Sequence, residues 1–127
     1  MSAGALAAVG IGAALGAWAR WALGALLNPL WPPLPLGTLT ANLAGGYLVG
    51  LAIAYFGDHA AIAPEARLFV ITGFLGALTT FSTFSAEGVA LLSRAQYAGW
   101  ALHAGSHLAG SIAMTFLGIV SWNALRG

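Results

Sequence analysis

The stretch GFLGALTTFSTFS, residues 73–85, places hydroxyl side chains in the middle of an otherwise apolar run. Within residues 79–83, four of the five side chains carry a hydroxyl: Thr79, Thr80, Ser82 and Thr83. Such side chains hydrogen-bond to nearby backbone groups and compete with the helix, and Gly73 and Gly76 add backbone freedom just before them. The segment is either a helix broken near Thr79 or an intact helix whose hydroxyls bond back to its own carbonyls.

The rest of the chain is too apolar for a soluble domain. Of its 127 residues, 60% are hydrophobic and only 6% are charged, and the mean hydropathy is +0.89. A soluble domain carries about 25% charged residues. Cysteine is absent, which excludes disulfides and thiolate metal sites, and a net charge of +1 excludes a basic surface for nucleic acid. We therefore predict an integral membrane protein, embedded in the lipid bilayer, with no nucleic-acid partner.

Four apolar runs reach the roughly 20 residues that a helix needs to cross a bilayer. They cover residues 3–27, 37–57, 66–92 and 97–124, and their connectors are about 9, 8 and 4 residues long. Connectors this short predict antiparallel neighbours. The predicted fold is a single all-α membrane domain over residues 1–127, with four transmembrane helices and a third helix broken near mid-membrane.

Irregular backbone at that depth is tolerated only where it is buried in protein or lines a cavity. Carbonyls freed by the break would suit a hard cation, as in the discontinuous helices of transporters. Small residues also recur at spacing four, for example Gly46 and Gly50 in the second run. Such faces let helices approach closely in lipid, so we expect a tightly packed bundle that forms an oligomer.

The arginines do not select an orientation for the four spans. Arg67 and Arg126 fall on the side of the two termini, whereas Arg20 and Arg94 fall on the opposite side. The positive-inside rule therefore gives no preference. Insertion in both directions would allow an antiparallel dimer.

Polar residues within the spans are costly and mark candidate sites. Asn42 lies early in the second span, one turn after Thr38, and its amide either joins two helices or offers N–H donors to an anion. Arg20 either extends its head to the interface or attracts anions at a vestibule. Glu87 follows the hydroxyl-rich stretch toward the end of the third span, and we expect it at the membrane interface rather than in the role of a proton carrier.

The fourth span carries polar side chains on one face, at a spacing of four residues: His103, His107, Ser111 and Thr115. We interpret this face as a hydrophilic track along a narrow aqueous path. The histidine pair alone does not predict a metal site, because no carboxylate or third ligand accompanies it in the sequence. No arrangement of nucleophile, acid and base is recognisable, so we predict that the protein is not an enzyme.

Three blocks of sequence resemble the signature segments of the Fluc family of fluoride channels, also called CrcB. They are GxxxRW at 16–21, PLGTLTANLAGGYLVG at 35–50 and GFLGALTTFSTFSAE at 73–87. The combination of TTFSTFS with the asparagine-bearing second block is highly specific. The resemblance extends over all four spans with no large insertion.

The resemblance implies a dual-topology homodimer in a prokaryotic inner membrane, with two pores that let cytoplasmic fluoride leave passively and so confer fluoride resistance. It implies a central sodium ion held by backbone carbonyls of Gly76 and Thr79, and a vestibule near Arg20. The pore positions that it implies, together with those of the polar faces, are Asn42, Phe81, Phe84, Thr38, Thr80, Ser82, Thr83, Ser111 and His107.

Three positions, in two places of the chain, depart from the family pattern. Ala77 stands where a second glycine is common, and His103 and His107 stand where hydroxyl-bearing residues are common. The alternative function is a proton-coupled small multidrug exporter, which also has four helices and dual topology. Such a carrier needs a carboxylate deep in its first span, and residues 3–27 contain none.

Overall fold

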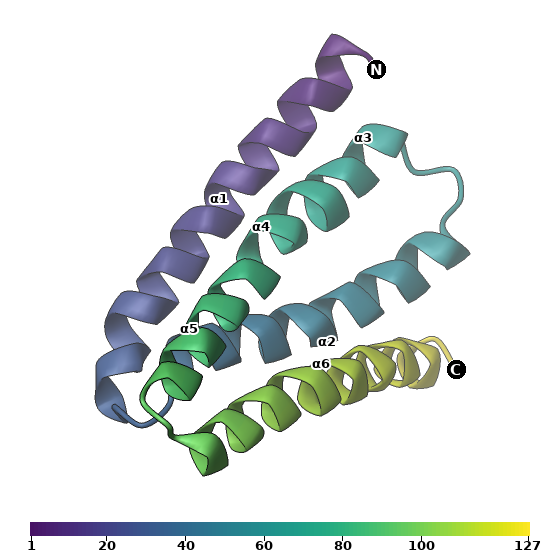
Figure 1. The fold of residues 1–127 in the computed structure, drawn as a ribbon. Coiled ribbons are helices and arrows are strands. Elements are labelled where there is room, and N and C mark those ends of the chain that lie inside the picture. Colours follow the sequence, from purple (N-terminus) through teal and green to yellow (C-terminus); the bar gives the residue numbers. More distant parts are fainter.

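The computed structural model describes residues 1–127 and consists of helices and their connections (Figure 1). In chain order these are α1 (Ala3–Leu27), the 3₁₀ turn η1 (Asn28–Leu30), α2 (Leu36–Asp58), α3 (Pro64–Arg67), the π-helical segment η2 (Leu68–Leu75), α4 (Gly76–Leu78), α5 (Phe81–Ser93) and α6 (Tyr97–Leu125). Four helical segments are long and apolar enough to cross a membrane: Ala3–Leu30, Leu36–Asp58, Pro64–Ser93 and Tyr97–Leu125. The predicted four-helix membrane fold is confirmed, with limits that differ by at most three residues.

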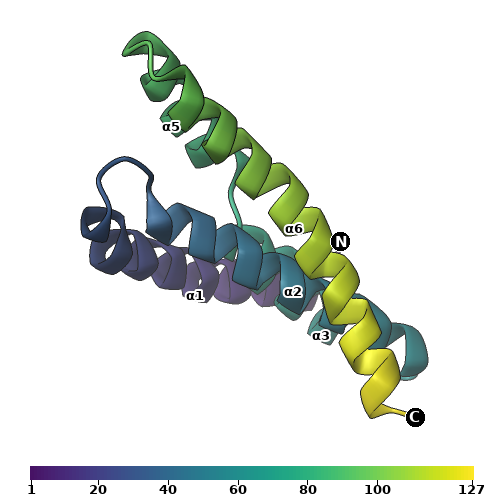
Figure 2. The ribbon, with the colours of Figure 1, turned by 90° about the horizontal axis from the view of Figure 1, so that it is seen from below.

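The helices run alternately up and down, and both chain ends lie at the same end of the bundle (Figures 1 and 2). α1 packs along η2 and α4, whereas α2 packs against α6. α5 contacts α6 and extends away from the first part of its own segment (Figure 2). The segment from Pro64 to Ser93 therefore links the two halves of the bundle: its first part packs on α1, and its last part, α5, contacts α6, which packs on α2.

The backbone of this third segment departs from the α-helix twice. From Leu68 to Leu75 it is π-helical, with a wider turn than an α-helix. α4 ends at Leu78, and Thr79 and Thr80 are then extended, with φ/ψ of −87°/153° and −152°/121°. α5 begins directly afterwards, so the two extended residues divide the segment close to its middle.

The proline-rich connector between α1 and α2 is closed by an asparagine. Asn28 follows α1, and its Oδ1 accepts hydrogen bonds from the backbone N–H groups of Gly37 (2.7 Å) and Thr38 (3.3 Å). These N–H groups belong to the first turn of α2, where no helical carbonyl is available to them. Asn28 thus caps α2 from nine residues away and fixes the turn between the two helices.

Glycines set the distance between the packed helices. A Cβ atom at Gly50 would overlap the carbonyl oxygen of Thr115 in α6, and one at Gly118 would overlap that of Tyr47 in α2. A Cβ at Gly16 would likewise overlap the carbonyl of Phe74 in η2. The backbones are therefore in direct contact at these crossings, as expected for small-residue faces in membrane helices.

Few large side chains are buried in the single chain. The core cluster contains Ala41, Ala52, Phe56, Leu75 and Leu78, while Trp21, Ile112 and Phe116 are among many large apolar residues that are exposed. An exposed apolar surface this extensive needs lipid or another protein to cover it. The distribution agrees with a membrane-embedded bundle.

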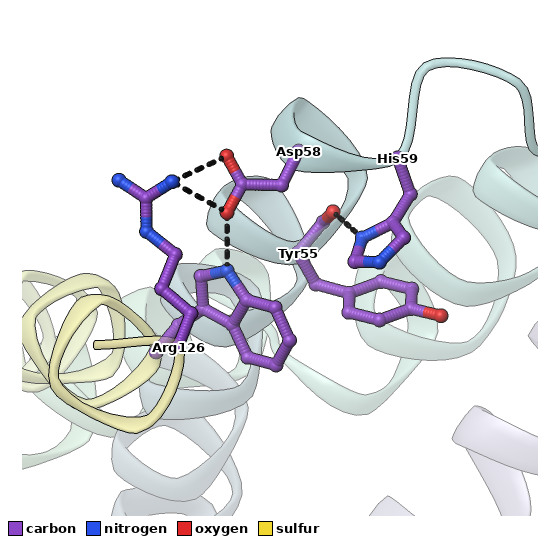
Figure 3. A network of polar contacts seen from close by, with 5 residues as sticks. Tyr55, Asp58, His59 and Arg126 are labelled. Carbon is purple, nitrogen blue, oxygen red and sulfur yellow. Dashed lines mark hydrogen bonds and ion pairs between the residues drawn. The ribbon is translucent and has the colours of Figure 1, made fainter.

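A polar network joins the ends of α2 and α6 (Figure 3). Trp122 Nε1 donates to Asp58 Oδ2 at 2.7 Å, and Arg126 Nη1 donates to Asp58 Oδ1 at 3.1 Å. His59 stacks on the ring of Tyr55 with a centroid distance of 4.3 Å, and its Nδ1 bonds to the Tyr55 carbonyl at 2.8 Å. Trp and Tyr favour the membrane–water boundary, so this end of the bundle carries the features of an interfacial anchor.

Candidate functional site

A hollow lies where the divided third segment faces α2 and α6. Eight of the predicted pore and cation residues line it: Asn42, Gly76, Thr79, Thr80, Phe81, Phe84, His107 and Ser111. Gly46, Val49, Leu108, Ile112 and Thr115 complete the lining. The hollow has a volume of about 470 Å³ and is open on one side. The fold therefore gathers polar and aromatic residues from three spans around one recess.

Asn42 in α2 holds the extended backbone of Thr80 at two points. The Thr80 N–H donates to Asn42 Oδ1 at 2.7 Å, and Asn42 Nδ2 donates to the Thr80 carbonyl at 3.0 Å. The paired contact fixes which end of the amide carries the oxygen. It also satisfies backbone groups that left the helical ladder, a requirement inside a membrane.

The second N–H of the Asn42 amide points at α6, where Asn42 Nδ2 lies 3.0 Å from Nδ1 of His107. Since Nδ2 is a donor, Nδ1 of His107 accepts. A neutral His107 then carries its proton on Nε2. Asn42 therefore connects the extended residues of the third segment to the polar face of α6.

The hydroxyl of Thr80 caps the N-terminus of α5. It accepts a hydrogen bond from the backbone N–H of Thr83 at 3.1 Å and contacts the hydroxyls of Thr83 (3.2 Å) and Ser82 (3.3 Å). This is the N-cap arrangement that threonine favours. Ser82 and Thr83 do not line the hollow, so their predicted pore role stays a prediction.

Two phenylalanines follow the cap on α5. The Phe81 ring is 71% exposed, while the Phe84 ring lies 5.4 Å from it, centroid to centroid. Phe84 stacks on His103 at 4.8 Å with an interplanar angle of 20°. Phe84 is therefore held between its neighbour and α6, whereas one side of Phe81 is uncovered in the single chain.

Arg20 in α1 binds the end of α4. Its Nε donates to the carbonyl of Ala77 at 2.9 Å. This carbonyl is one of those for which no helical N–H follows, because the ladder stops at Leu78. The sequence did not indicate this contact, Arg20 does not line the hollow, and its vestibule role stays a prediction. Because Arg20 and Ala77 are 57 residues apart in the sequence, no local pattern predicts this contact.

Thr38 also lies outside the hollow. Its hydroxyl donates to Glu87 Oε2 at 2.7 Å. Glu87, which we expected at the membrane interface, therefore faces the other helices, and its second oxygen is buried without a partner. The predicted face of α6 divides in the same way, because His107, Ser111 and Thr115 line the hollow and His103 does not.

The carbonyls expected to bind a cation lie at the division of the third segment. None of the backbone hydrogen bonds outside the regular helices ends on the carbonyl of Gly76 or Thr79, whereas the Leu75 carbonyl accepts from the Thr79 N–H at 3.1 Å. Both residues line the hollow. Free carbonyl oxygens are ligands suited to a hard cation, so the chemistry of these positions fits sodium.

Comparisons with known proteins agree on one family. The family model described as "CrcB-like protein, Camphor Resistance (CrcB)" matches residues 7–119. The chain is 65% identical over 122 residues to the "Fluoride-specific ion channel FluC" of Nitrosospira multiformis, covering 94% of this chain and 95% of that protein. It is 58% identical over 119 residues to the protein of the same name from Thiobacillus denitrificans, covering 94% and 96%. The corresponding Ralstonia pickettii protein is 60% identical over 111 residues, covering 87% and 88%.

Proposed function

The chain belongs to the CrcB family, and from that membership we propose that it is a fluoride-selective channel. The resemblance identified in its sequence is thereby confirmed. The family consists of ion channels, which also confirms that the protein is not an enzyme. In the proposed role, neutral hydrogen fluoride enters a cell and ionises, and the channel lets the trapped anion leave down its electrochemical gradient.

The observation that carries the proposal is the hollow, which brings together six of the nine predicted pore residues with no arginine or lysine among its lining. Fluoride is small and strongly hydrated, so a pore must replace its water with hydrogen-bond donors. The hydroxyls of Thr80 and Ser111 lie at this place. Both N–H groups of Asn42 are engaged within the chain, so Asn42 would offer a donor to fluoride by turning one N–H away from His107. Conduction needs several weak sites rather than one strong one, and neutral donors meet that need.

Phe81 and Phe84 support the same mechanism. The edge of an aromatic ring is positive and its face is negative, so an anion can approach the ring edge without meeting a full charge. Phe84 is held in place by His103. Arg20 keeps a proposed vestibule role, because only its Nε is engaged by Ala77 and the remaining guanidinium N–H groups can attract anions.

We further propose that two chains assemble as an antiparallel homodimer in a prokaryotic plasma (inner) membrane, with two pores. A single chain leaves the hollow open on one side and Phe81 largely exposed, so a second chain is needed to enclose a path. The balanced arginine distribution supports insertion in both orientations. In that dimer, the division at Thr79 and Thr80 acts as the break of the third transmembrane helix.

A structural sodium ion belongs to the same proposal. The carbonyls of Gly76 and Thr79 would hold it, one set from each chain, and the assignment is supported because no backbone hydrogen bond outside the regular helices ends on either carbonyl. Bound there, the ion would supply positive charge at the dimer centre. The residues of this chain would orient the carbonyls, with Arg20 and Asn42 fixing the backbone on either side.

Ion release from reconstituted liposomes tests the function. Fluoride and chloride efflux are followed by ion-selective electrodes after a potassium ionophore is added to balance charge. We expect rapid fluoride release and no chloride release above that of empty liposomes. Equal release of the two anions, or none, contradicts the proposal. Proton-driven uptake of a cationic drug in the same liposomes would instead favour the multidrug exporter, although Ala3–Leu30 contains no carboxylate for it.

A further inference from the structure

Three ionisable side chains meet beside the hollow. Glu87 comes from α5, and His103 and His107 lie one turn apart on α6. One ligand atom from each of the three lies within 4.8 Å of the others. The two imidazole rings are 4.5 Å apart, centroid to centroid, and the residues are only 1% and 4% exposed. Buried histidines paired with a carboxylate are uncommon inside a membrane and mark a functional site.

Two members of the trio, His103 and Glu87, are already oriented by a neighbouring group. Nε2 of His103 lies 2.9 Å from the Phe84 carbonyl. Because a carbonyl only accepts, Nε2 carries the proton and Nδ1 of a neutral His103 keeps its lone pair. Oε2 of Glu87 is fixed by the Thr38 hydroxyl, which donates to it. A ring N–H donated to a carbonyl and a hydrogen-bonded carboxylate are the arrangements found around metal ligands.

Two atoms of the trio lack partners. Glu87 Oε1 and His107 Nε2 are buried and form no hydrogen bond within the chain. Unpaired polar atoms in a buried place are costly, and two of them in one cluster call for a group that bridges them. A bound cation would compensate the carboxylate and take up a nitrogen lone pair at the same time.

We propose that Glu87, His103 and His107 bind a divalent transition-metal ion of the zinc type. Two imidazoles and one carboxylate form a ligand set that zinc accepts, with a fourth position left for water. A tetrahedral zinc ion holds its ligand atoms about 3.4 Å apart, so the side chains move inward by a small rotation on binding. Magnesium and calcium prefer all-oxygen sites and are not expected here.

Binding competes with the Asn42 contact. Nε2 of His107 must lose its proton to bind the ion, since ligands bind in their deprotonated form. A neutral ring then carries its proton on Nδ1, where it faces the N–H donor of Asn42. The metal and the Asn42–His107 hydrogen bond therefore exclude each other, and ion binding releases the α6 end of the Asn42 connection.

Cobalt titration of the tag-free, full-length protein in detergent tests the site without reference to fluoride. Tetrahedral Co²⁺ absorbs visible light far more strongly than the hydrated ion. We expect one saturable Co²⁺ per chain with such a band, which zinc displaces. E87Q, H103S and H107S should each weaken Co²⁺ binding at least tenfold. H59S alters an exposed histidine at the C-terminal end of α2 and should leave Co²⁺ binding unchanged. Loss of the band in H59S alone, or unchanged binding in any of the three ligand variants, overturns the proposal.

Two further measurements guard against variants that fail to fold. Zinc should raise the thermal midpoint of the unaltered protein, because a ligand that binds only the native state stabilises it, and magnesium should not. N42A removes the donor that faces Nδ1 and should bind Co²⁺ severalfold more tightly than the parent protein. An unmoved midpoint with zinc, or weaker binding in a folded N42A variant, contradicts the assignment.

Discussion

Asn42 and Thr80 form a closed pair of hydrogen bonds between α2 and the extended backbone that divides the third segment. The Thr80 N–H donates to Oδ1 at 2.7 Å, and Nδ2 returns a bond to the Thr80 carbonyl at 3.0 Å. The side chain thus replaces both hydrogen bonds that a helical neighbour would have given. This contact supplies the hydrogen bonds that the extended backbone of Thr80 needs inside a bilayer, and it sets the shape of the hollow.

N42A should therefore destabilise the protein and stop fluoride flux. The change leaves the N–H and the carbonyl of Thr80 without partners, at a cost of about 1–3 kcal/mol in unfolding free energy. Unfolding in a graded SDS titration measures the loss, and liposome efflux measures the flux. N123A, the same substitution at an exposed position of α6, is the matched control and should leave both measurements unchanged. Parent-like stability in N42A would show that the Thr80 backbone finds other partners.

Arg20 stabilises the other side of the same division through the Ala77 carbonyl. R20M keeps the aliphatic stem and removes the donor, so we expect the unfolding free energy to fall by about 1 kcal/mol. Hydrogen exchange at the amides of residues 77–81 should quicken in this variant. R94M alters an arginine that is exposed and should change neither quantity. If R20M and R94M behave alike, the hydrogen bond to Ala77 does not hold the end of α4.

G50A tests the close approach of α2 and α6. A Cβ atom at this position would overlap the Thr115 carbonyl oxygen, a backbone atom that cannot rotate away. Overpacking of this kind costs about 1–3 kcal/mol, and we expect a lower thermal midpoint in detergent. G105A is the control, because a Cβ there meets nothing within 4 Å of the single chain. A neutral G50A together with a disruptive G105A would place the tight contact at an interface between chains.

The sequence predicted the four spans because their length and apolar content are local properties. It also indicated the division near Thr79, since hydroxyls and glycines act on the nearest backbone. The π-helical turn of Leu68–Leu75 was not foreseen. Its residues are mostly ordinary apolar ones with no local signal for a wider turn, and the segment packs against α1.

The sequence could not predict which side chains on different helices contact each other. Asn42 was recognised as costly in a membrane, but nothing in its neighbourhood indicated Thr80. Glu87 was assigned to the interface because it follows the span's polar stretch, whereas its partners Thr38 and His103 lie on other helices. For the same reason, the sequence did not indicate that Glu87 lies beside His103 and His107. These contacts depend on the order of the helices around the bundle, and the hydrophobic periodicity of each helix does not predict that order.

Replacing sodium by a bulky organic cation tests the carbonyl site. The proposal predicts a lower thermal midpoint in N-methyl-D-glucamine than in sodium at equal ionic strength, because a ligand bound only to the native state stabilises it by mass action. Lithium and potassium at the same concentration serve as size controls and should stabilise less. Equal midpoints and equal fluoride efflux in all four solutions would remove sodium from the carbonyls of Gly76 and Thr79.

Phe81 gives the sharpest test of the pore itself. Its ring is 71% exposed in the single chain and lines the hollow, so shortening it should not disturb the fold. F81I keeps the apolar character and removes the positive ring edge. We expect fluoride efflux to fall by at least about tenfold, which corresponds to a barrier about 1.4 kcal/mol higher, while the proposed dimer elutes unchanged on gel filtration.

F116I alters an equally exposed phenylalanine of α6 outside the hollow and should conduct like the parent protein. Because both variants lose one aromatic ring from an exposed face, a difference between them isolates the pore position from a general effect on lipid contact or assembly. Equal efflux in both would exclude Phe81 from the fluoride path.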